Sequence, residues 1–299
     1  MLLSALAPAL LARSHFPPPG AALDVAVSGG RDSLALLALG VAAGCEVTAY
    51  HVDHGLRPGS AEEAGVVAAA AARLGAAFVS LTAPCEPGPN LEARARTARF
   101  AVLPAGAATG HTADDQAETV LLNLLRGAGL DGLSGMRPGP RHPILELRRA
   151  EAAQFVDSLD FEVVADPSNS DPAYRRNRVR LELLPLLEEI SARDLVPLLC
   201  RQAAILSDER DLLDHLATAV DPEDIAALSG APLPLQRRAL RRWLTRDSSG
   251  GYPPDAAALE RVLEVARGDV IACELPGGRR VRRSHGRLQL TSPLAKERR

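Results

Sequence analysis

Short apolar runs alternate with longer amphipathic stretches through the first half of the chain. The runs have the length and continuity of buried strands and lie at 23–27, 45–52, 76–81 and 106–110. Each is followed by residues whose apolar positions repeat at helical spacing, over 31–37, 61–74, 91–103 and 114–125. This alternation predicts an α/β fold with a doubly wound parallel sheet, in which ligands bind beyond the carboxyl ends of the strands.

The pattern changes after a turn-rich connector at 166–172. A helix is predicted through 181–190, then a mostly helical region to about Gly268 and short strands over 270–290. The run 1–12 is apolar, but it lacks a basic start and is too short to span a bilayer, so it predicts a packed helix rather than a signal peptide. We expect a catalytic domain over residues 1–190, followed by a smaller, mostly helical domain with a short β tail over residues 191–299.

Composition narrows the class of protein. Of the 299 residues, 46% are hydrophobic and 24% are charged, as in an ordinary soluble protein, and the net charge of −3 argues against a uniformly basic nucleic-acid binder. The sequence has no Cys-x-x-Cys pair, which excludes a typical disulfide framework, zinc site or iron–sulfur site. A reducing cytoplasmic setting without a membrane partner is expected. The four widely spaced cysteines are Cys45, Cys85, Cys200 and Cys273.

The first predicted strand leads into Ser28-Gly29-Gly30-Arg31-Asp32-Ser33, a glycine turn that opens a helix. Glycines let backbone N–H groups approach a ligand, and the start of a helix favours an anion, so the turn predicts a phosphate cradle. A Walker loop is excluded because the only lysine is Lys296. A dinucleotide-type spacing at 127–132 follows a helical run instead of a strand, which predicts a helix end. A plain glycine turn is the alternative.

The second predicted strand ends near His51, Asp53 and His54. Two histidines around an aspartate could ligate a metal, which would indicate a metal-dependent hydrolase. Against this, His51 should still lie on the strand and point away from the loop. Polar loop residues with a helix cap at Ser60 explain the spacing equally well, so the spacing alone leaves both interpretations open.

Two further stretches carry charged pairs at helical spacing. Arg96 and Arg99 share one predicted helix face, where paired guanidinium groups can clamp a phosphate, with a solvated surface as the alternative. In the stretch 110–119, Thr112 or Asp114 can cap a helix on which Asp115 and Glu118 lie about 60° apart. Beside a phosphate loop such a carboxylate pair indicates a bound cation, either Mg²⁺ or an ammonium substrate, and capping alone is the alternative.

Arginines cluster at 175–180, 237–246 and 279–287, with no acid inside any of the three clusters. A solvated surface is the usual role of such runs, whereas contact with a folded RNA backbone is the functional alternative. Aromatic residues make up only 3% of the chain, so stacking on single strands cannot be the main mode of contact.

Together these motifs resemble the tRNA(Ile)-lysidine synthetase family, within the ATP pyrophosphatase or PP-loop superfamily, over about residues 22–187. The resemblance is carried by 28–33, 52–57, the helix of Arg96 and Arg99, 111–119, 166–169 and 176–180. Arg31 stands where many relatives have proline, and the chain after about residue 193 matches only loosely.

The resemblance implies that ATP, with Mg²⁺, adenylates the C2 oxygen of the wobble cytidine in a tRNA(Ile) with a CAU anticodon. Free L-lysine then displaces AMP to give lysidine. ATP binding is implied for Ser28, Gly29, Gly30, Arg31, Asp32, Ser33 and His54, with Asp32 also near Mg²⁺. Catalysis is implied for Asp32, Arg96, Arg99 and His111, and lysine binding for Asp115 and Glu118. The tRNA would contact Asn169, Arg176, Asn177, Arg180, Arg237, Arg238, Arg241 and Arg242.

Three other functions compete with this one. A tRNA-thiolating enzyme of the same superfamily would generally need cysteine pairs, which are missing here. A metal-dependent hydrolase would use the histidines near Asp53, and a non-catalytic RNA-binding module would bind ATP without turnover. The sequence leaves the oligomeric state open, with a homodimer among the alternatives.

Overall fold

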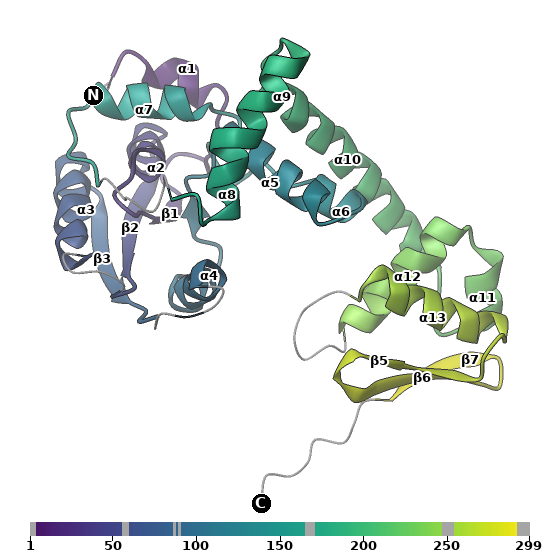
Figure 1. Cartoon of the computed structure of the whole chain (residues 1–299). Helices are drawn as coiled ribbons and strands as arrows, with labels where there is room; N and C mark the ends of the chain where they lie inside the picture. Colours follow the sequence, from purple (N-terminus) through teal and green to yellow (C-terminus); the bar gives the residue numbers. More distant parts are fainter. Residues whose placement is uncertain are drawn as a thin grey trace, which may run out of the picture. The chain divides into compact units, whose positions relative to one another are not determined.

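The computed structural model describes residues 4–55, 60–85, 88, 91–164, 171–246 and 254–291. The chain divides at Ser207 into two compact units, and the division falls within helix α10 (Val196–Leu216) (Figure 1). The functional division that the sequence places after residue 190 stays a prediction. No helix in the described ranges is long and apolar enough to cross a membrane.

The first unit is built on a parallel sheet with the strand order β3-β2-β1-β4. Strands β1 and β2 pair in parallel so that Val25 faces Ala49, and β4 pairs with the other edge of β1 at Ala108. These three side chains are fully buried, which places the core on the sheet itself. The doubly wound parallel sheet is therefore confirmed. The strands are β1 (Ala22–Ala26), β2 (Glu46–Asp53), β3 (Ala77–Thr82) and β4 (Ala108–Thr109).

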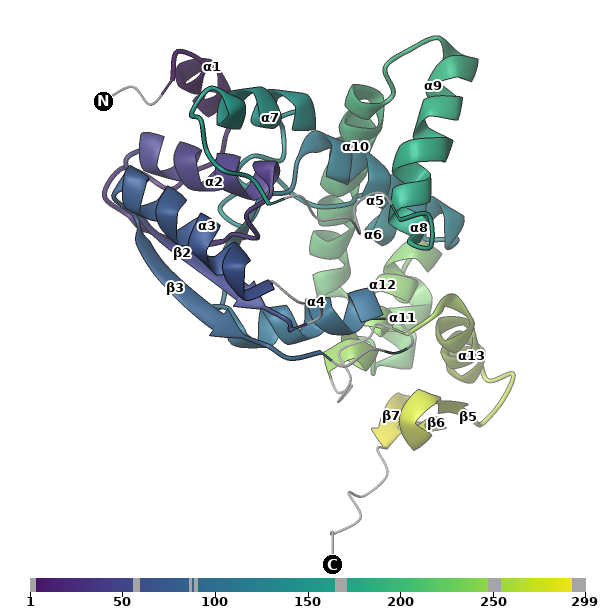
Figure 2. The ribbon, with the colours of Figure 1, turned by 60° about the vertical axis from the view of Figure 1, so that its left-hand side comes forward.

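Helices cover both faces of this sheet. Figure 2 shows α2 (Arg31–Ala42) and α3 (Ser60–Leu74) on one face and α4 (Leu91–Val102) on the other. Every residue of α2 from Leu34 to Leu39 is fully buried, because α7 (Arg149–Asp157) covers its outer side with Phe155. The predicted packed first helix is α1 (Ala7–Leu11), which joins the same core.

A second layer of helices extends from the β4 edge. Helix α5 (Ala113–Leu125) buries Ala117 and Leu121 against Val179, Leu184 and Val196. This packing brings the start of the segment 175–191 beside the acids of α5, which matters for the site. The elements involved are α6 (Leu130–Leu133), α8 (Arg175–Arg178), the π-helical turn η2 (Val179–Leu183), α9 (Leu184–Ser191) and the first part of α10.

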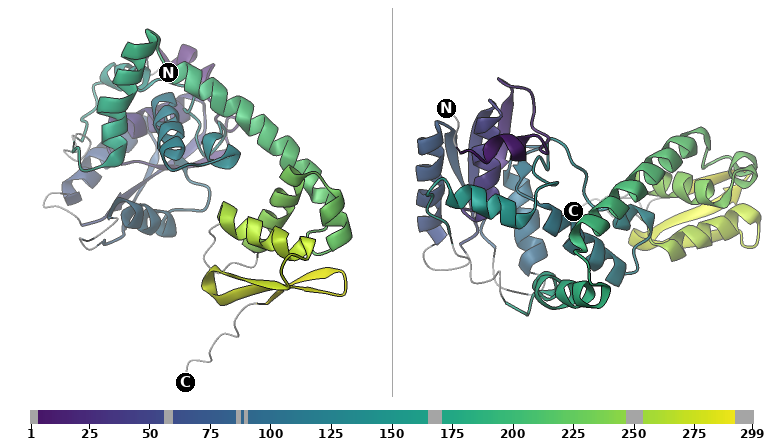
Figure 3. Two further views of the ribbon diagram at one scale, coloured as in Figure 1. Left: turned by 45° about the vertical axis from the view of Figure 1, so that its right-hand side comes forward. Right: turned by 90° about the horizontal axis from the view of Figure 1, so that it is seen from above.

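The second unit packs helices on a small antiparallel sheet with the order β5-β6-β7 (Figure 3). Leu240 and Leu263 from the helices meet Val281 and Leu288 from the strands, and all four are almost completely buried. A mostly helical region with a β tail is therefore confirmed. Its elements are η3 (Ala217–Ala219), α11 (Ile225–Gly230), α12 (Leu233–Arg246), α13 (Ala256–Arg267), β5 (Ala272–Leu275), η4 (Pro276–Gly278), β6 (Arg279–Ser284) and β7 (Arg287–Thr291).

Gly110 holds the end of β4 against the first turn of α2. A Cβ atom at this position would stand 2.7 Å from the carbonyl oxygen of Asp32 and 3.0 Å from Cα of Ser33, both on the backbone. Gly110→Ala should therefore force the two elements apart and lower the free energy of unfolding by about 1–3 kcal/mol. Chemical denaturation measures this loss.

Gly65→Ala is the matched control, because Gly65 lies in α3 with nothing within 4 Å of its Cβ position. Alanine should stabilise that helix by up to about 1 kcal/mol. Equal effects of the two substitutions would contradict the tight packing of Gly110.

Candidate active site

The turn between β1 and α2 is built by its own polar groups. Gly29 has φ +84°, and a Cβ atom there would lie 2.5 Å from a methyl group of Val164, so the position requires glycine. Ser33 Oγ accepts from the backbone N–H of Ser28 at 3.2 Å and donates to the carbonyl oxygen of Gly30 at 2.8 Å. No described side chain caps α2 at its N-cap, Gly30, so the N–H groups of its first turn face a site suited to an anion.

Asp32 stands in the first turn of α2 beside this phosphate cradle. Its Oδ2 accepts from Nε of Arg149 at 3.4 Å, whereas its buried Oδ1 has no hydrogen-bond partner among the described residues. Burial raises the pKa of Asp32 to about 6, with repulsion from Asp115 as the second cause. A carboxylate in this state is suited to a cation delivered with the ligand.

Glu118 is the centre of a buried ion-pair cluster and is fully inaccessible to solvent. Its Oε1 accepts from Nη1 of Arg149 at 3.0 Å and from Nε of Arg180 at 2.7 Å. Its Oε2 accepts from Nε of Arg176 at 2.7 Å. Each arginine comes from a different turn or helix, so this one carboxylate ties α5 to α7 and to the segment that begins at α8.

Asp115 belongs to the same cluster through one oxygen only. Its Oδ1 accepts from Arg149 at 2.8 Å and from Arg176 at 3.0 Å, while Oδ2 accepts from the backbone N–H of Thr112 at 2.8 Å. Burial alone would raise the pKa of Asp115, but Arg149 and Arg176 outweigh it and lower the pKa to about 2. Asp115 and Glu118 thus lie together as predicted. The cap of α5 uses Oδ2 of Asp115, and only its Oδ1 belongs to the ion-pair cluster.

The cluster is electrically balanced. Asp32, Asp115 and Glu118 supply three negative charges, and Arg149, Arg176 and Arg180 supply three positive charges within ion-pair distance of them. Buried charges are stable when they are paired and hydrogen-bonded, as Asp115 and Glu118 are through both oxygens, whereas Asp32 keeps Oδ1 without a partner among the described residues.

His111 lies after β4, next to the cluster. Burial lowers the pKa of His111 to about 4, despite the opposing effect of Asp115, so the imidazole is neutral at physiological pH. Its Nδ1 is 2.7 Å from the hydroxyl of Thr109, which is also 2.9 Å from Nδ1 of His142. The two rings meet edge to face, with centroids 5.0 Å apart.

The residues around Asp53 do not form a metal site. His51 is buried and its Nδ1 bonds the carbonyl oxygen of Val27 at 2.9 Å, while His54 uses Nδ1 on the carbonyl oxygen of Ala83. Within the described ranges no group of three His, Cys, Asp or Glu side chains could hold a metal ion. Arg99 donates to Nε2 of His54 at 3.4 Å, so this histidine and this arginine lie together.

Comparison with known proteins decides the family. A PP-loop domain model matches residues 10–187, and a TilS substrate binding domain model matches residues 224–289. The chain is 39% identical to tRNA(Ile)-lysidine synthase of Thermobifida fusca, over 91% of this chain and 92% of the relative. The chain belongs to the tRNA(Ile)-lysidine synthase family. The enzyme of that name from Mycolicibacterium paratuberculosis is 40% identical over 85% of each chain.

Among solved structures, the U34-tRNA thiolase NcsA from Methanococcus maripaludis shares the fold, with a TM-score of 0.54 at 16% identity. The match covers 67% of this chain and 78% of the thiolase. This likeness confirms the α/β fold, whereas the lysidine synthase family, and not the thiolases, is the one that the full-length relatives identify.

Arg149 is the site residue that sequence reasoning missed. It begins α7, and its backbone N–H donates to Oδ2 of Asp114 at 2.7 Å, so Asp114 caps α7 and not its own helix. The sequence held a signal for it, because an arginine at the first position of a helix opposes the helix dipole and therefore indicates acidic partners elsewhere in the fold.

Other lysidine synthase residues expected from the sequence lie elsewhere. Arg31 pairs with Asp157 on α7 at 3.0 Å, and Asn177 is buried and donates to the carbonyl oxygen of Asp171. Asn169 lies outside the described residues. Arg176 and Arg180 belong to the ion-pair cluster, so their roles in tRNA contact stay predictions.

The two later arginine clusters meet acids from other elements. Arg237 pairs with Glu260 at 3.2 Å, Arg238 pairs with Asp214, and Arg242 donates to the carbonyl oxygen of Asp214. Arg279 is almost fully buried and donates to the carbonyl oxygen of Leu244. Acid-free runs in the sequence are therefore not acid-free in space, and the tRNA contacts of Arg237, Arg238, Arg241 and Arg242 remain a prediction.

Proposed function

We propose that this protein joins free lysine to C2 of the wobble cytidine of tRNA(Ile) with a CAU anticodon, consuming ATP. The observation that carries the proposal is the match of both family models, in order, within relatives that align over nearly the whole chain. The ligase would work in the cytoplasm, and the TilS-type region at 224–289 would bind the tRNA substrate.

ATP would place its phosphates in the turn 28–33, at the start of α2. Mg²⁺ usually keeps few protein ligands and binds mainly through phosphate oxygens, which fits the one suitable carboxylate among the described residues of this site. The unpartnered, buried Oδ1 of Asp32 fits such an ion. When bound, Mg²⁺ would neutralise charge on the phosphates.

In the first step the C2 oxygen of cytidine attacks the α-phosphorus, and pyrophosphate leaves with the electron pair of the broken bond. Backbone N–H groups at the start of α2 would stabilise the negative charge that develops on the phosphates. Neutral His111 adds no positive charge next to the cytidine, which itself becomes cationic on adenylation.

Lysine would bind at the ion-pair cluster. A free amino acid carries both an ammonium and a carboxylate group, and the cluster offers carboxylates and guanidinium groups side by side. The ammonium groups would face Asp115 and Glu118, and the α-carboxylate would face an arginine such as Arg176. In the second step the ε-ammonium loses a proton to solvent, and the resulting amine attacks C2. The bond from C2 to its adenylated oxygen breaks, AMP leaves with that oxygen and the electron pair, and the attacking nitrogen loses a second proton.

The products of ATP cleavage test this function. With tRNA and lysine present, the protein should release AMP and pyrophosphate, and the RNA should gain one lysine. Without lysine, pyrophosphate release should stop after about one equivalent, because the adenylated RNA is not consumed. Release of ADP and phosphate, or sulfur incorporation into the RNA, would overturn the proposal.

A further inference from the structure

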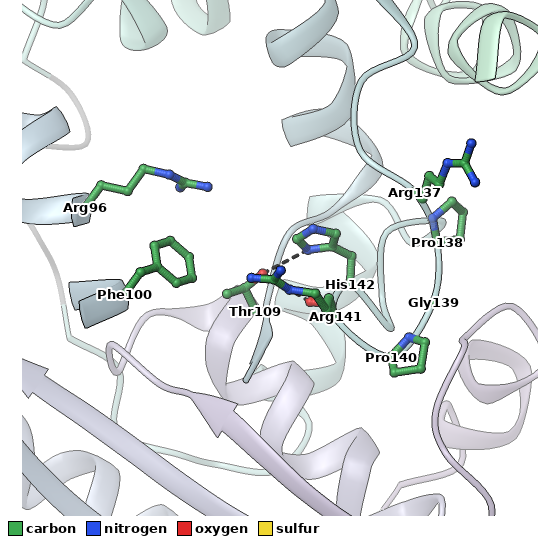
Figure 4. Close-up of a pocket in the computed structure, with 9 residues that line it drawn as sticks. All are labelled: Arg96, Phe100, Thr109, Arg137, Pro138, Gly139, Pro140, Arg141 and His142. Atoms are coloured by element: carbon green, nitrogen blue, oxygen red, sulfur yellow. Dashed lines mark hydrogen bonds between the residues drawn. The ribbon is translucent and has the colours of Figure 1, made fainter. Parts of the chain in front are cut away.

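A cavity of about 430 Å³ lies between α4 and the loop that follows α6. Figure 4 shows Arg96 and Phe100 on one wall, Arg137 with two prolines on the opposite wall, and Thr109, Arg141 and His142 between them. None of the residues 28–33 lines it, but its residue Thr109 directly precedes Gly110, which packs against the backbone of Asp32, so the cavity adjoins the turn 28–33. Its size falls in the range that accepts one small ligand.

The charge of the lining selects the kind of ligand. Three arginines line the cavity, and no carboxylate is among the described residues that line it. Guanidinium groups bind phosphate with high geometric specificity, whereas they would repel the ammonium groups of lysine. The ligand is therefore anionic and different from the amino acid.

The shape of the lining points to a flat ring beside that anion. The guanidinium carbon of Arg96 lies 5.0 Å from the ring centroid of Phe100, and the prolines Pro138 and Pro140 form an apolar wall across the cavity. Nucleic-acid bases stack on aromatic rings and on arginine planes in this way, especially when they are unpaired.

The wall between them is polar and connects to the reaction centre. The Thr109 hydroxyl lies 2.9 Å from the ring of His142 and 2.7 Å from the ring of His111. Burial lowers the pKa of His142, with Arg141 and Arg96 as further causes, so it is neutral and can read the edge of a base. A base that contacts His142 in the cavity would be linked to His111 through the hydroxyl of Thr109.

The loop that carries two of the arginines is held in place before any ligand arrives. The side chain of Gln116 accepts from the backbone N–H of Met136 at 2.8 Å and donates to its carbonyl oxygen at 2.9 Å. The N–H of Thr109 donates to the carbonyl oxygen of Arg141 at 2.9 Å. A preorganised loop loses little freedom on binding, as a recognition site requires.

We propose that this cavity holds one unpaired nucleotide of the RNA substrate, with its base against Phe100 and its 5′ phosphate on Arg137 and Arg141. The identity of the RNA rests on the proposed function. The nucleotide is the wobble cytidine, because the cavity shares Thr109 with His111 at the reaction centre. ATP also carries a base and phosphates, so the experiment below distinguishes ATP from a nucleotide of the RNA as the occupant of the cavity.

Binding of an anticodon stem-loop hairpin tests the site without turnover. Three hairpins are compared by fluorescence anisotropy: the intact one, one without the base at the wobble position, and one with an uncharged methylphosphonate on its 5′ side. Loss of the base should weaken binding to the unsubstituted protein about fivefold to a hundredfold. Phe100→Leu should weaken binding of the intact hairpin by a similar factor. This variant should bind the hairpin without the wobble base no more weakly than the intact one.

The arginines have matched tests. Arg137→Ala and Arg141→Ala should each weaken binding of the intact hairpin about tenfold. Each variant should also respond less to the methylphosphonate than the unsubstituted protein does, because only one arginine is left on the phosphate. Arg126→Ala, an exposed arginine outside the cavity, should change affinity less than about twofold. The affinity for MgATP should stay the same in all of these variants.

The inference would be overturned if the loss of affinity from a protein substitution and the loss from the matching RNA change simply added up. It would also be overturned if the unsubstituted protein bound the base-free hairpin as tightly as the intact one. Variants that lose MgATP affinity and keep hairpin affinity would assign the cavity to ATP and also overturn it. The proposed function is judged separately, by lysine-dependent AMP release from the unsubstituted protein, so the two ideas can fail independently.

Discussion

Replacing Asp32 by asparagine should reduce turnover by about a hundredfold or more and make the folded protein more stable at alkaline pH. The first effect follows because the buried Oδ1 of Asp32 is the oxygen that we propose to hold Mg²⁺ beside the phosphates of ATP. The second follows from the pKa of Asp32, which burial raises from 3.8 to about 6. A carboxyl that resists ionisation in the folded protein costs stability at every pH at which the unfolded chain ionises it.

The sign of the pH dependence is fixed by these two pKa values. Below about pH 4 the carboxyl is protonated in the folded and unfolded states, so asparagine should change little. Between about pH 4 and pH 6 the unfolded chain ionises this carboxyl and the folded protein does not, so the advantage of asparagine should grow over this range and level off at about 3 kcal/mol above it. Thermal unfolding without ligands at pH 5 and pH 8 measures it, and equal advantages at both pH values would contradict the cause given.

Glu118→Gln should destabilise the protein more than any exposed charge substitution, by about 3–5 kcal/mol. The carboxylate is fully buried and accepts from three arginines, so a neutral amide leaves buried positive charge without its partner. Urea unfolding measures the loss. Lysine affinity, measured in parallel on the folded fraction, should fall as well.

Glu182→Gln is the matched control. Glu182 pairs with Arg178 at 2.9 Å, four residues earlier on the chain, but both side chains are exposed. Solvent screens such a pair, so the control should unfold like the unsubstituted protein. A loss for Glu118→Gln no greater than for this control would mean that the arginines find other partners when the carboxylate is removed.

The fold was largely predictable from hydrophobic periodicity. The strands expected at 45–52 and 76–81 are β2 and β3 within one residue, because continuous apolar runs between helical patterns leave little choice. The run 106–110 forms only the two-residue β4, since Gly110 turns the chain against α2 instead of extending the strand. That close approach depends on tertiary packing and leaves no periodic signal.

The candidate site was predictable where its residues are close in sequence. Asp115 and Glu118 lie three residues apart on one helix, so their common partners follow from helix geometry. Arg149 comes from a helix that starts far along the chain, and only the packing of α7 on α2 brings it to Asp32. The cavity residues Arg137 and Arg141 lie in a loop with no pattern that helix or strand reasoning detects.

The arginine clusters show the limit of counting charge along the sequence. Glu118, Glu260 and Asp214 are all distant in sequence from the arginines they pair with. The positive electrostatic potential available to RNA therefore depends on ion pairs that only the fold creates. Counting arginines in an acid-free run of the sequence overestimates this potential.

The two oxygens of Asp115 limit any redesign of the lysine site that we propose. One oxygen fixes the first turn of α5 through Thr112, and the other belongs to the charged cluster. A mutant library that varies Asp115 would lose correctly folded members before any new specificity could be selected.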